Sequence, residues 1–105
     1  ALAYVQLKNL DAALADYDKV IELKPEYEKA YNNRGLARYR LKQYKGAIQD
    51  YNKAIALKAD YADAYYNRGA ARYALGDKNG ACTDWQRARL FGVAKATALI
   101  QKLCQ

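Results

Sequence analysis

The sequence predicts an all-α protein in which antiparallel helix pairs stack into a repeat array. Residues of the same type recur at an offset of about 34 positions along the chain. They include Tyr31 and Tyr65, Gly35 and Gly69, and Ala47 and Ala81. Apolar residues within each copy also recur at helical spacing. A fixed period of this size is typical of solenoids, in which each helix pair packs against its neighbours.

The composition favours helices within a single domain of residues 1–105. The chain has 105 residues, enough for a modest core, and much of its apolar content is Ala, Leu and 11 Tyr. It contains one Pro, and Pro is the strongest helix breaker whereas Ala is the best helix former. We therefore expect helices throughout, joined by short turns.

Residues 1–27 are expected to form a partial repeat. Residues 1–7 resemble the last turns of a helix, and a second helix is expected to begin at the N-cap Asp11 and to end before Pro25. Because Ala1 falls where a repeat is already under way, we expect the natural chain to begin earlier.

Two full repeats, 28–61 and 62–93, are each expected to form two helices. A link of two residues joins the helices of each pair, so they must pack antiparallel. The predicted helices span 29–41, 44–57, 62–75 and 78–90.

Residues 94–105 are predicted to cap the array. The pattern breaks at Phe91 and Gly92, and one more helix is expected over 93–105. Its inward face would carry Ala96, Leu99, Ile100 and Leu103. The opposite face is polar, as suits a helix that covers the last hairpin.

Small and aromatic residues at fixed positions identify a family resemblance. One copy has Tyr31, Gly35, Ala47, Tyr51 and Ala54, and the next has Tyr65, Gly69, Ala81, Trp85 and Ala88. This pattern resembles the tetratricopeptide repeat over nearly the whole chain. The resemblance implies a right-handed superhelical stack of helix hairpins, an α-solenoid with a concave groove. Independently of the name, the small residues suit close helix approach and the aromatic residues fill the space between hairpins.

Arginines replace two apolar positions of the family pattern. Arg34 and Arg68 stand where the family has Leu, and Arg38 and Arg72 stand where it has its second aromatic residue. Aspartates precede the aromatic residue of each second helix, at Asp16, Asp50 and Asp84. We interpret these residues as structural ion pairs across and between hairpins. The alternative is that the four arginines form an anion or phosphate site.

The resemblance also places a set of residues on the groove. They are Lys29, Asn32, Asn33, Leu36, Tyr39 and Arg40 in one copy, and Asp63, Tyr66, Asn67, Ala70, Tyr73 and Ala74 in the next. Amides such as those of Asn33 and Asn67 both donate and accept, which suits the backbone of an extended peptide, and the tyrosines offer flat contact area. The alternative is that these residues are solvated helix surface.

The chaperone-binding members of this family hold a C-terminal carboxylate with Lys, Asn and Arg. Asn33 fits that pattern, but Asp63 stands where Lys is needed and Asn67 where Arg is needed. We therefore do not expect a chaperone-tail clamp.

The charge distribution favours an acidic protein or peptide partner. Residues 28–58 carry eight Lys or Arg and two acids, which accounts for most of the net charge of +7. The chain has no Gly-rich phosphate loop and no Lys/Arg run, which argues against a nucleic-acid partner. No apolar run approaches the roughly 20 residues of a membrane span. Solvated surface charge is the alternative explanation.

The residue inventory argues against catalysis. The chain has no His, so a His general base and His-containing metal sites are excluded, and two Cys are too few for a Cys-only zinc site. We expect a non-enzymatic protein with no metal, no cofactor and no small-molecule substrate.

Cys82 and Cys104 are expected to lie close together, because two antiparallel helices would place them side by side. They form either a disulfide or two buried thiols. Pairs of helices often miss disulfide geometry, which favours thiols. The compartment stays open, since thiols suit the cytoplasm and a disulfide suits a periplasmic or secreted protein.

These features together predict a non-catalytic interaction scaffold that binds a peptide in its groove. The second hypothesis is a self-assembly module. The incomplete first repeat would leave Tyr4 and Tyr17 poorly covered, and such an edge can bind a second copy.

Overall fold

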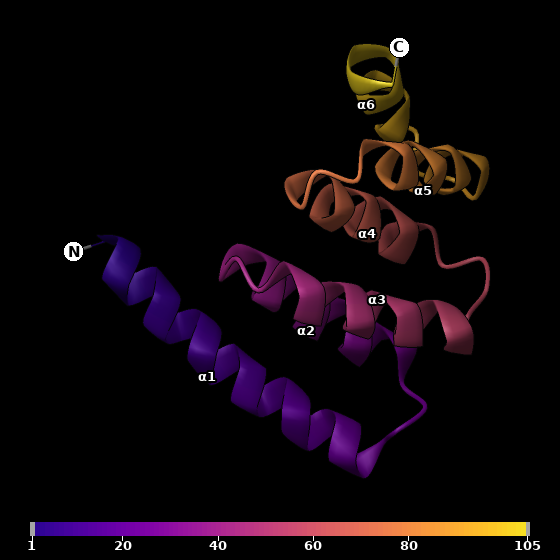
Figure 1. Cartoon of the computed structure of the whole chain (residues 1–105). Coiled ribbons are helices and arrows are strands. Elements are labelled where there is room, and N and C mark those ends of the chain that lie inside the picture. Colours follow the sequence, from indigo (N-terminus) through magenta and orange to yellow (C-terminus); the bar gives the residue numbers. More distant parts are fainter. Residues whose placement is uncertain (1, 105) are drawn as a thin grey trace.

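The computed structural model describes the backbone of residues 2–104 and the side chains of residues 9–104. It is a right-handed stack of helices that runs from α1 at one end to α6 at the other (Figure 1). The helices are α1 (Leu2–Leu23), α2 (Glu28–Arg40), α3 (Tyr44–Leu57), α4 (Ala62–Ala74), α5 (Lys78–Leu90) and α6 (Ala96–Leu103). This described part of the chain contains no strand, so the predicted all-α fold is confirmed.

Helices α2 and α3 form one hairpin and α4 and α5 form the next, with α3 packed against α4 between them. The predicted bounds of α3 and α5 are confirmed, and those of α2 and α4 differ by one residue. The apolar core follows this stack in three clusters of small and aromatic side chains. Each hairpin therefore buries its apolar face only by stacking on the next.

The predicted helix start at Asp11 is wrong, because α1 continues from Leu2 to Leu23 without a break. In the α2–α3 hairpin the corresponding turn requires Lys42 to adopt a φ of 63°, and in the α4–α5 hairpin Gly76 has a φ of 90°. Lys8 occupies the repeat position equivalent to Lys42, so a turn there would require Lys8 to adopt the same left-handed conformation. This conformation is unfavourable for residues other than glycine.

The last helix is shorter than the predicted 93–105. Gly92 has a φ of 120°, and Val93 and Ala94 form a turn in which their carbonyls accept from the N–H groups of Ala96 and Thr97. The inward face is as predicted: Ala96 is fully buried, and Leu99, Ile100 and Leu103 pack against the cluster around Trp85.

Two glycines set the distance between the helices of each hairpin. A Cβ atom on Gly35 would lie 2.6 Å from Cε1 of Tyr51, and one on Gly69 would lie 2.5 Å from Nε1 of Trp85. Such distances are well inside van der Waals contact. The aromatic ring from the second helix therefore lies directly against the backbone of the first.

Buried carboxylates tie each first helix to its second helix. Asp50 accepts hydrogen bonds from Nε and Nη2 of Arg34 and from Nη1 of Arg38, at 2.7–3.2 Å. Asp84 accepts the equivalent bonds from Arg68 and Arg72 at 2.8–3.0 Å. The side chains of Asp50 and Asp84 are 4% and 0% exposed. The four arginines are thus engaged by protein carboxylates, as the ion-pair interpretation predicts.

Neighbouring hairpins are joined by the same arginines. Nη1 of Arg34 donates to Asp18 of α1 at 2.9 Å, and Nη1 of Arg68 donates to Asn52 of α3 at 2.8 Å. The predicted third aspartate, Asp16, is exposed, and it is Asp18 that makes the ion pair. Asp18 and Asn52 lie two residues after the core aspartate position, on the helix face that meets the next hairpin.

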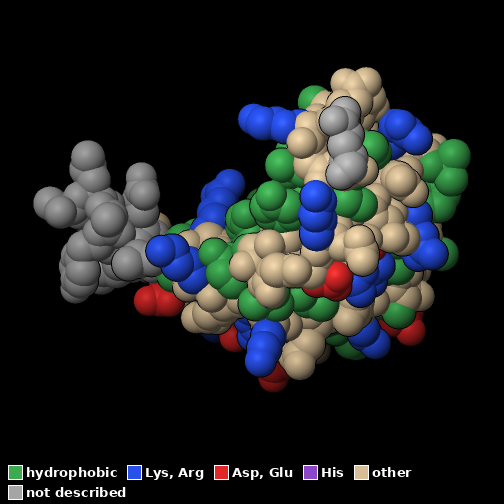
Figure 2. Space-filling view, turned by 45° about the horizontal axis from the view of Figure 1, so that its top comes forward, with side chains coloured by type: hydrophobic (Ala, Val, Ile, Leu, Met, Phe, Trp, Pro, Cys, Tyr) green, Lys and Arg blue, Asp and Glu red, His purple; other side chains and the backbone are tan. Residues whose placement is uncertain are grey.

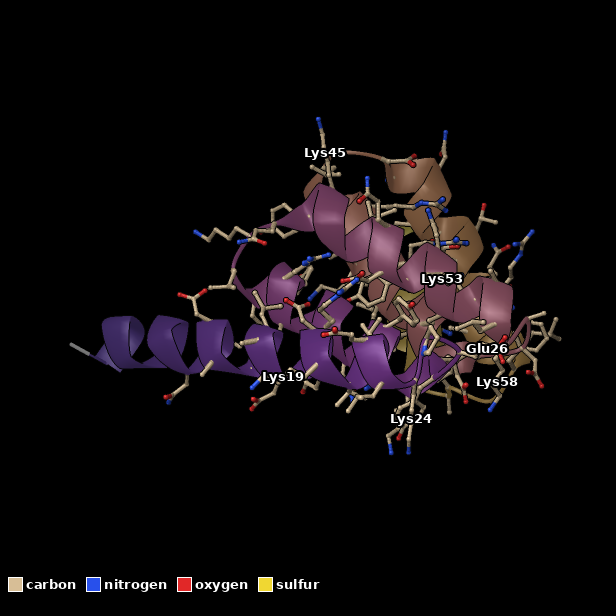
Figure 3. The ribbon with its side chains drawn as sticks, turned by 90° about the horizontal axis from the view of Figure 1, so that it is seen from below. Lys19, Lys24, Glu26, Lys45, Lys53 and Lys58 are labelled. Atoms are coloured by element: carbon tan, nitrogen blue, oxygen red, sulfur yellow. A yellow bond between two sulfur atoms is a disulfide. The ribbon has the colours of Figure 1, made fainter. Side chains whose placement is uncertain are left out.

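Basic side chains cover several faces of the molecule. Figure 2 shows blue Lys and Arg side chains distributed around a face on which hydrophobic residues are also exposed, with few red acids. In Figure 3 Lys45, Lys53 and Lys58 project outward in different directions. Much of the positive charge is therefore solvated surface and is not gathered into one patch.

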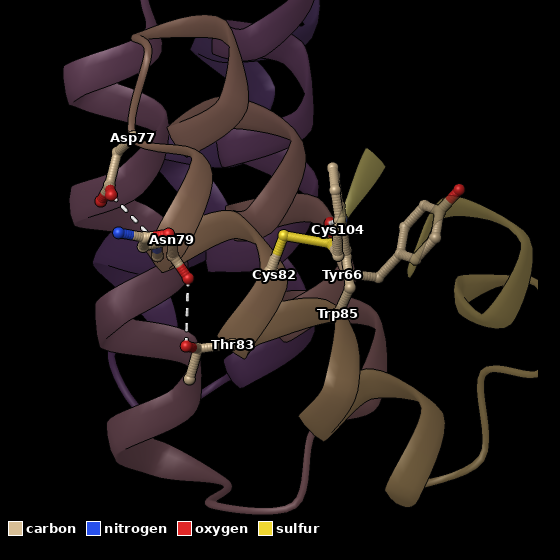
Figure 4. The surroundings of a disulfide bond; sticks show 8 residues. Tyr66, Asp77, Asn79, Cys82, Thr83, Trp85 and Cys104 are labelled. Carbon is tan, nitrogen blue, oxygen red and sulfur yellow. Dashed lines mark hydrogen bonds between the residues drawn. A yellow bond between two sulfur atoms is a disulfide. The ribbon is translucent and has the colours of Figure 1, made fainter. Parts of the chain in front are cut away.

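A disulfide joins α5 to the end of α6. Cys82 and Cys104 are bonded, with a Cα–Cα distance of 5.8 Å, beside Tyr66 and Trp85 (Figure 4). The sequence left open either a disulfide or two free thiols and favoured the thiols. The structure contains the disulfide, so the prediction of thiols is wrong. This helix pair does not miss the geometry of a disulfide, because its Cα–Cα distance of 5.8 Å lies within the range that the bond spans.

We expect Gly69→Ala to destabilise the fold by about 2 kcal/mol, since the new methyl group would overlap the indole of Trp85. Gly46→Ala is the matched control, because its Cβ would meet only the flexible side chain of Arg38 at 3.4 Å. Because Ala favours helix more than Gly does, Gly46→Ala should be neutral or should stabilise the fold by up to about 1 kcal/mol. Urea unfolding measures both, and equal effects would contradict the close-approach argument.

Asp50→Ala should lower the free energy of unfolding by about 3 kcal/mol, because it leaves Arg34 and Arg38 without their buried partner. Asp16→Ala changes the same residue type at the equivalent repeat position, but there the side chain is exposed. We expect that control to change stability by less than about 0.5 kcal/mol. An unchanged melting temperature for Asp50→Ala would refute the structural role of the pair.

Reduction of the disulfide should cost about 3 kcal/mol, since it closes a loop with a sequence separation of 22 residues. Hydrogen exchange should then rise first in α6, which the bond holds against α5. The double variant Cys82→Ala/Cys104→Ala provides the control, because its stability should not respond to reductant. If reductant destabilises both proteins equally, the bond does not account for the change.

Candidate functional site

The candidate site is a hollow between the first helices of the two complete hairpins. Its volume is about 330 Å³. The lining residues are Leu36, Tyr39 and Arg40 from α2, Tyr66, Asn67 and Ala70 from α4, and Tyr51 from α3. A larger hollow of about 450 Å³ lies at the α1–α2 turn, and its lining among the described residues is 24–27, which includes none of the predicted groove residues.

The structure brings together half of the predicted groove residues. Six of the seven lining side chains were placed on the groove by the family resemblance. The seventh, Tyr51, was predicted only as a core aromatic residue. The sequence offered one signal of a different role: Tyr51 carries a hydroxyl group, whereas the equivalent residue of the next hairpin, Trp85, does not.

The other predicted groove residues do not line this hollow. Asn32 is buried, and its Oδ1 accepts a hydrogen bond from Nδ2 of Asn67 at 3.1 Å. The Tyr73 ring packs against Trp85 with a centroid distance of 5.8 Å. The remaining predicted residues outside the lining are Lys29, Asn33, Asp63 and Ala74. Their role in ligand binding stays a prediction.

The Asn32–Asn67 hydrogen bond links α2 directly to α4 across the groove face. It orients the Asn67 amide and uses one of its two N–H donors, so its second N–H and its carbonyl oxygen still have hydrogen-bonding capacity. On the same helix, the Tyr66 ring packs under Nζ of Lys95, 4.6 Å from the ring centroid. Asn67 and Tyr66 are therefore held by contacts from α2 and from the turn before α6.

The hollow combines apolar walls with positive charge. Leu36 and Ala70 supply aliphatic surface, and the exposed Arg40 supplies a cation. None of the described residues that line it is acidic. Burial raises the pKa of the Tyr51 hydroxyl well above its usual value, as does the neighbouring Tyr39, so the phenol keeps its proton at neutral pH. The arrangement suits an anionic or hydrogen-bond-accepting group.

Metal-binding clusters and membrane-spanning helices are both absent from the described residues. Within them no three His, Cys, Asp or Glu side chains gather where they could hold a metal ion. None of the described helices combines the length and the hydropathy that crossing a membrane requires.

Comparison with known proteins identifies the architecture. A family model described as TPR repeat matches residues 1–42 and 37–76. A search of curated protein sequences finds no match.

Solved structures match the chain along almost its whole length. The first TPR of Spaghetti (RPAP3) bound to the HSP90 peptide SRMEEVD is 34% identical, with a TM-score of 0.88, and the match covers 97% of this chain and 82% of that one. The first TPR domain of human RPAP3 is 32% identical, with a TM-score of 0.87 and coverage of 98% and 90%. The Arabidopsis OM64 TPR domain is 25% identical, with a TM-score of 0.83 and coverage of 96% and 93%.

The family match covers residues 1–76, which is more than half of the chain, and this part contains both close-approach glycines, Gly35 and Gly69. The chain belongs to the tetratricopeptide repeat family.

Proposed function

We propose that this protein is a non-catalytic interaction module that binds an acidic peptide segment of a partner protein between α2 and α4. The observation that carries the proposal is the hollow itself. It gathers an exposed arginine, an oriented amide and three tyrosines around apolar walls, and none of its described lining residues is acidic. Such a surface complements a peptide with negative side chains.

A structural neighbour supports a peptide partner. The first TPR of Spaghetti (RPAP3), 34% identical to this chain, is bound to the peptide SRMEEVD, which contains two Glu and one Asp. Asp63 and Asn67 occupy positions where chaperone-binding members of the family have Lys and Arg. The proposal is therefore limited to an acidic peptide and does not extend to the chaperone tail.

Self-assembly through the N-terminal edge is the second functional hypothesis. Tyr17 is half-buried on α1, and Tyr4 lies outside the side chains that the structure describes. Light scattering over a range of concentrations tests this hypothesis, and a stable dimer would favour it.

The proposal predicts that an unbiased peptide array will select acidic sequences and that Arg40→Gln will weaken their binding by roughly fivefold to tenfold. Arg89→Gln is the matched control, because Arg89 is also exposed but lies on α5, away from the hollow. Both variants lose one positive charge, so non-specific attraction would weaken binding equally in both. Isothermal titration calorimetry distinguishes the two cases, and equal losses would reject the hollow as the site.

A further inference from the structure

Tyr51 contains a hydrogen-bond donor that the protein itself does not use. Its side chain is fully buried, at 0% exposure. Among the side chains that the structure describes, its Oη is the buried polar atom without a hydrogen-bond partner. Buried hydroxyl groups are nearly always paired, because an unpaired one costs stability. The orphan hydroxyl of Tyr51 therefore needs an explanation.

The other buried aromatic donors, Trp85, Tyr31 and Tyr65, are all paired. Trp85 occupies the same repeat position in the next hairpin, and its Nε1 donates to the carbonyl oxygen of Tyr66 at 3.2 Å. The hydroxyls of Tyr31 and Tyr65 donate to the carbonyl oxygens of Pro25 and Ala59 at 3.1 and 2.9 Å. Among the buried aromatic side chains that the structure describes, Tyr51 is therefore the one whose polar group is unpaired.

The position of Tyr51 directs its polar end to the groove. Of the described residues that line the hollow, Tyr51 alone comes from α3, which packs against both α2 and α4. Its ring atoms Cδ1, Cε1 and Cζ lie against the backbone of α2 at Gly35. Because the ring crosses α2 to reach a hollow between α2 and α4, its distal end, which carries the hydroxyl, is the part expected at the hollow.

The surroundings of that hydroxyl define what it would bind. The phenol stays protonated at neutral pH, so it donates, and Arg40 adds a positive charge to the same lining. Leu36 and Ala70 provide walls suited to methylene groups. A short aliphatic side chain that ends in a carboxylate matches all three features: apolar walls, a neutral donor and a cation.

Resting on the proposed function, we propose that the hollow is a specificity pocket for one acidic side chain of the bound peptide. The carboxylate accepts a hydrogen bond from Tyr51 Oη at the base of the hollow and lies within the field of Arg40. The pocket therefore selects an acidic residue at one position of the peptide, whereas the rest of the groove contacts the peptide more generally.

The test is the Tyr51→Phe variant with two blocked peptides, acetylated and amidated tetraglutamate and tetraglutamine. Amide shifts of Leu36 and Ala70 in ¹⁵N–¹H spectra report binding at the hollow. We expect the wild type to prefer tetraglutamate and Tyr51→Phe to bind it at least about tenfold more weakly, with little change for tetraglutamine. We also expect Tyr51→Phe to raise the melting temperature, because it removes an unpaired buried hydroxyl.

Tyr65→Phe is the matched control, since it deletes a tyrosine hydroxyl that donates to the backbone of Ala59. It should lower the melting temperature and leave the affinity for tetraglutamate unchanged. Equal tetraglutamate affinity of the wild type and Tyr51→Phe would overturn the pocket. So would a loss of stability in Tyr51→Phe, because the hydroxyl would then have a partner within the protein.

The outcomes separate the pocket from the general function. If array peptides bind in an Arg40-dependent manner but Tyr51→Phe binds them as the wild type does, the pocket is refuted and the peptide-binding proposal stands. If tetraglutamate shifts neither amide at about 10 mM and the array selects no peptide, both proposals are refuted.

Discussion

The absence of a side chain at Gly35 and Gly69 is the constraint on which the rest of the structure depends. At each glycine the aromatic ring of the following helix lies against the backbone of the first helix. This contact sets the separation of the two helices and buries Tyr51 and Trp85 almost completely. It also lets Tyr51 extend from α3 to the hollow between α2 and α4. One packing requirement thus shapes both the core and the candidate site.

Charge is used in two different ways in this repeat array. Where the family pattern has apolar residues, this chain has arginines that are held by Asp50 and Asp84. Those arginines are largely neutralised inside the fold, so they contribute little to attraction of a ligand. Arg40 follows Arg38 by two residues on α2, which places it on a nearly opposite face of the helix, where it is exposed and lines the hollow. The helix face therefore decides whether an arginine supports the fold or faces a partner.

Local sequence signals predicted most of the helices and failed where packing decides. The bounds of α3 and α5 were predicted because apolar spacing and turn residues agree there. The break at Asp11 was wrong, because α1 continues through this position, whereas the corresponding turns after α2 and α4 have left-handed residues at Lys42 and Gly76. The predicted Asp16 pair was likewise wrong, because the ion pair to α1 depends on how two hairpins are rotated against each other.

The sequence by itself determined the repeat, the helix pairs, the close-approach glycines and the Arg–Asp pairs, because each follows from spacing along one chain or from recurrence at a fixed period. Tertiary structure decided which groove residues meet, that Asn67 bonds to Asn32, and that Cys82 is bonded to Cys104. It also decided that the Tyr51 hydroxyl is unpaired whereas the Trp85 indole is paired. Periodicity specifies the face of a helix on which a residue lies, but hydrogen bonding between helices depends on distances that only packing sets.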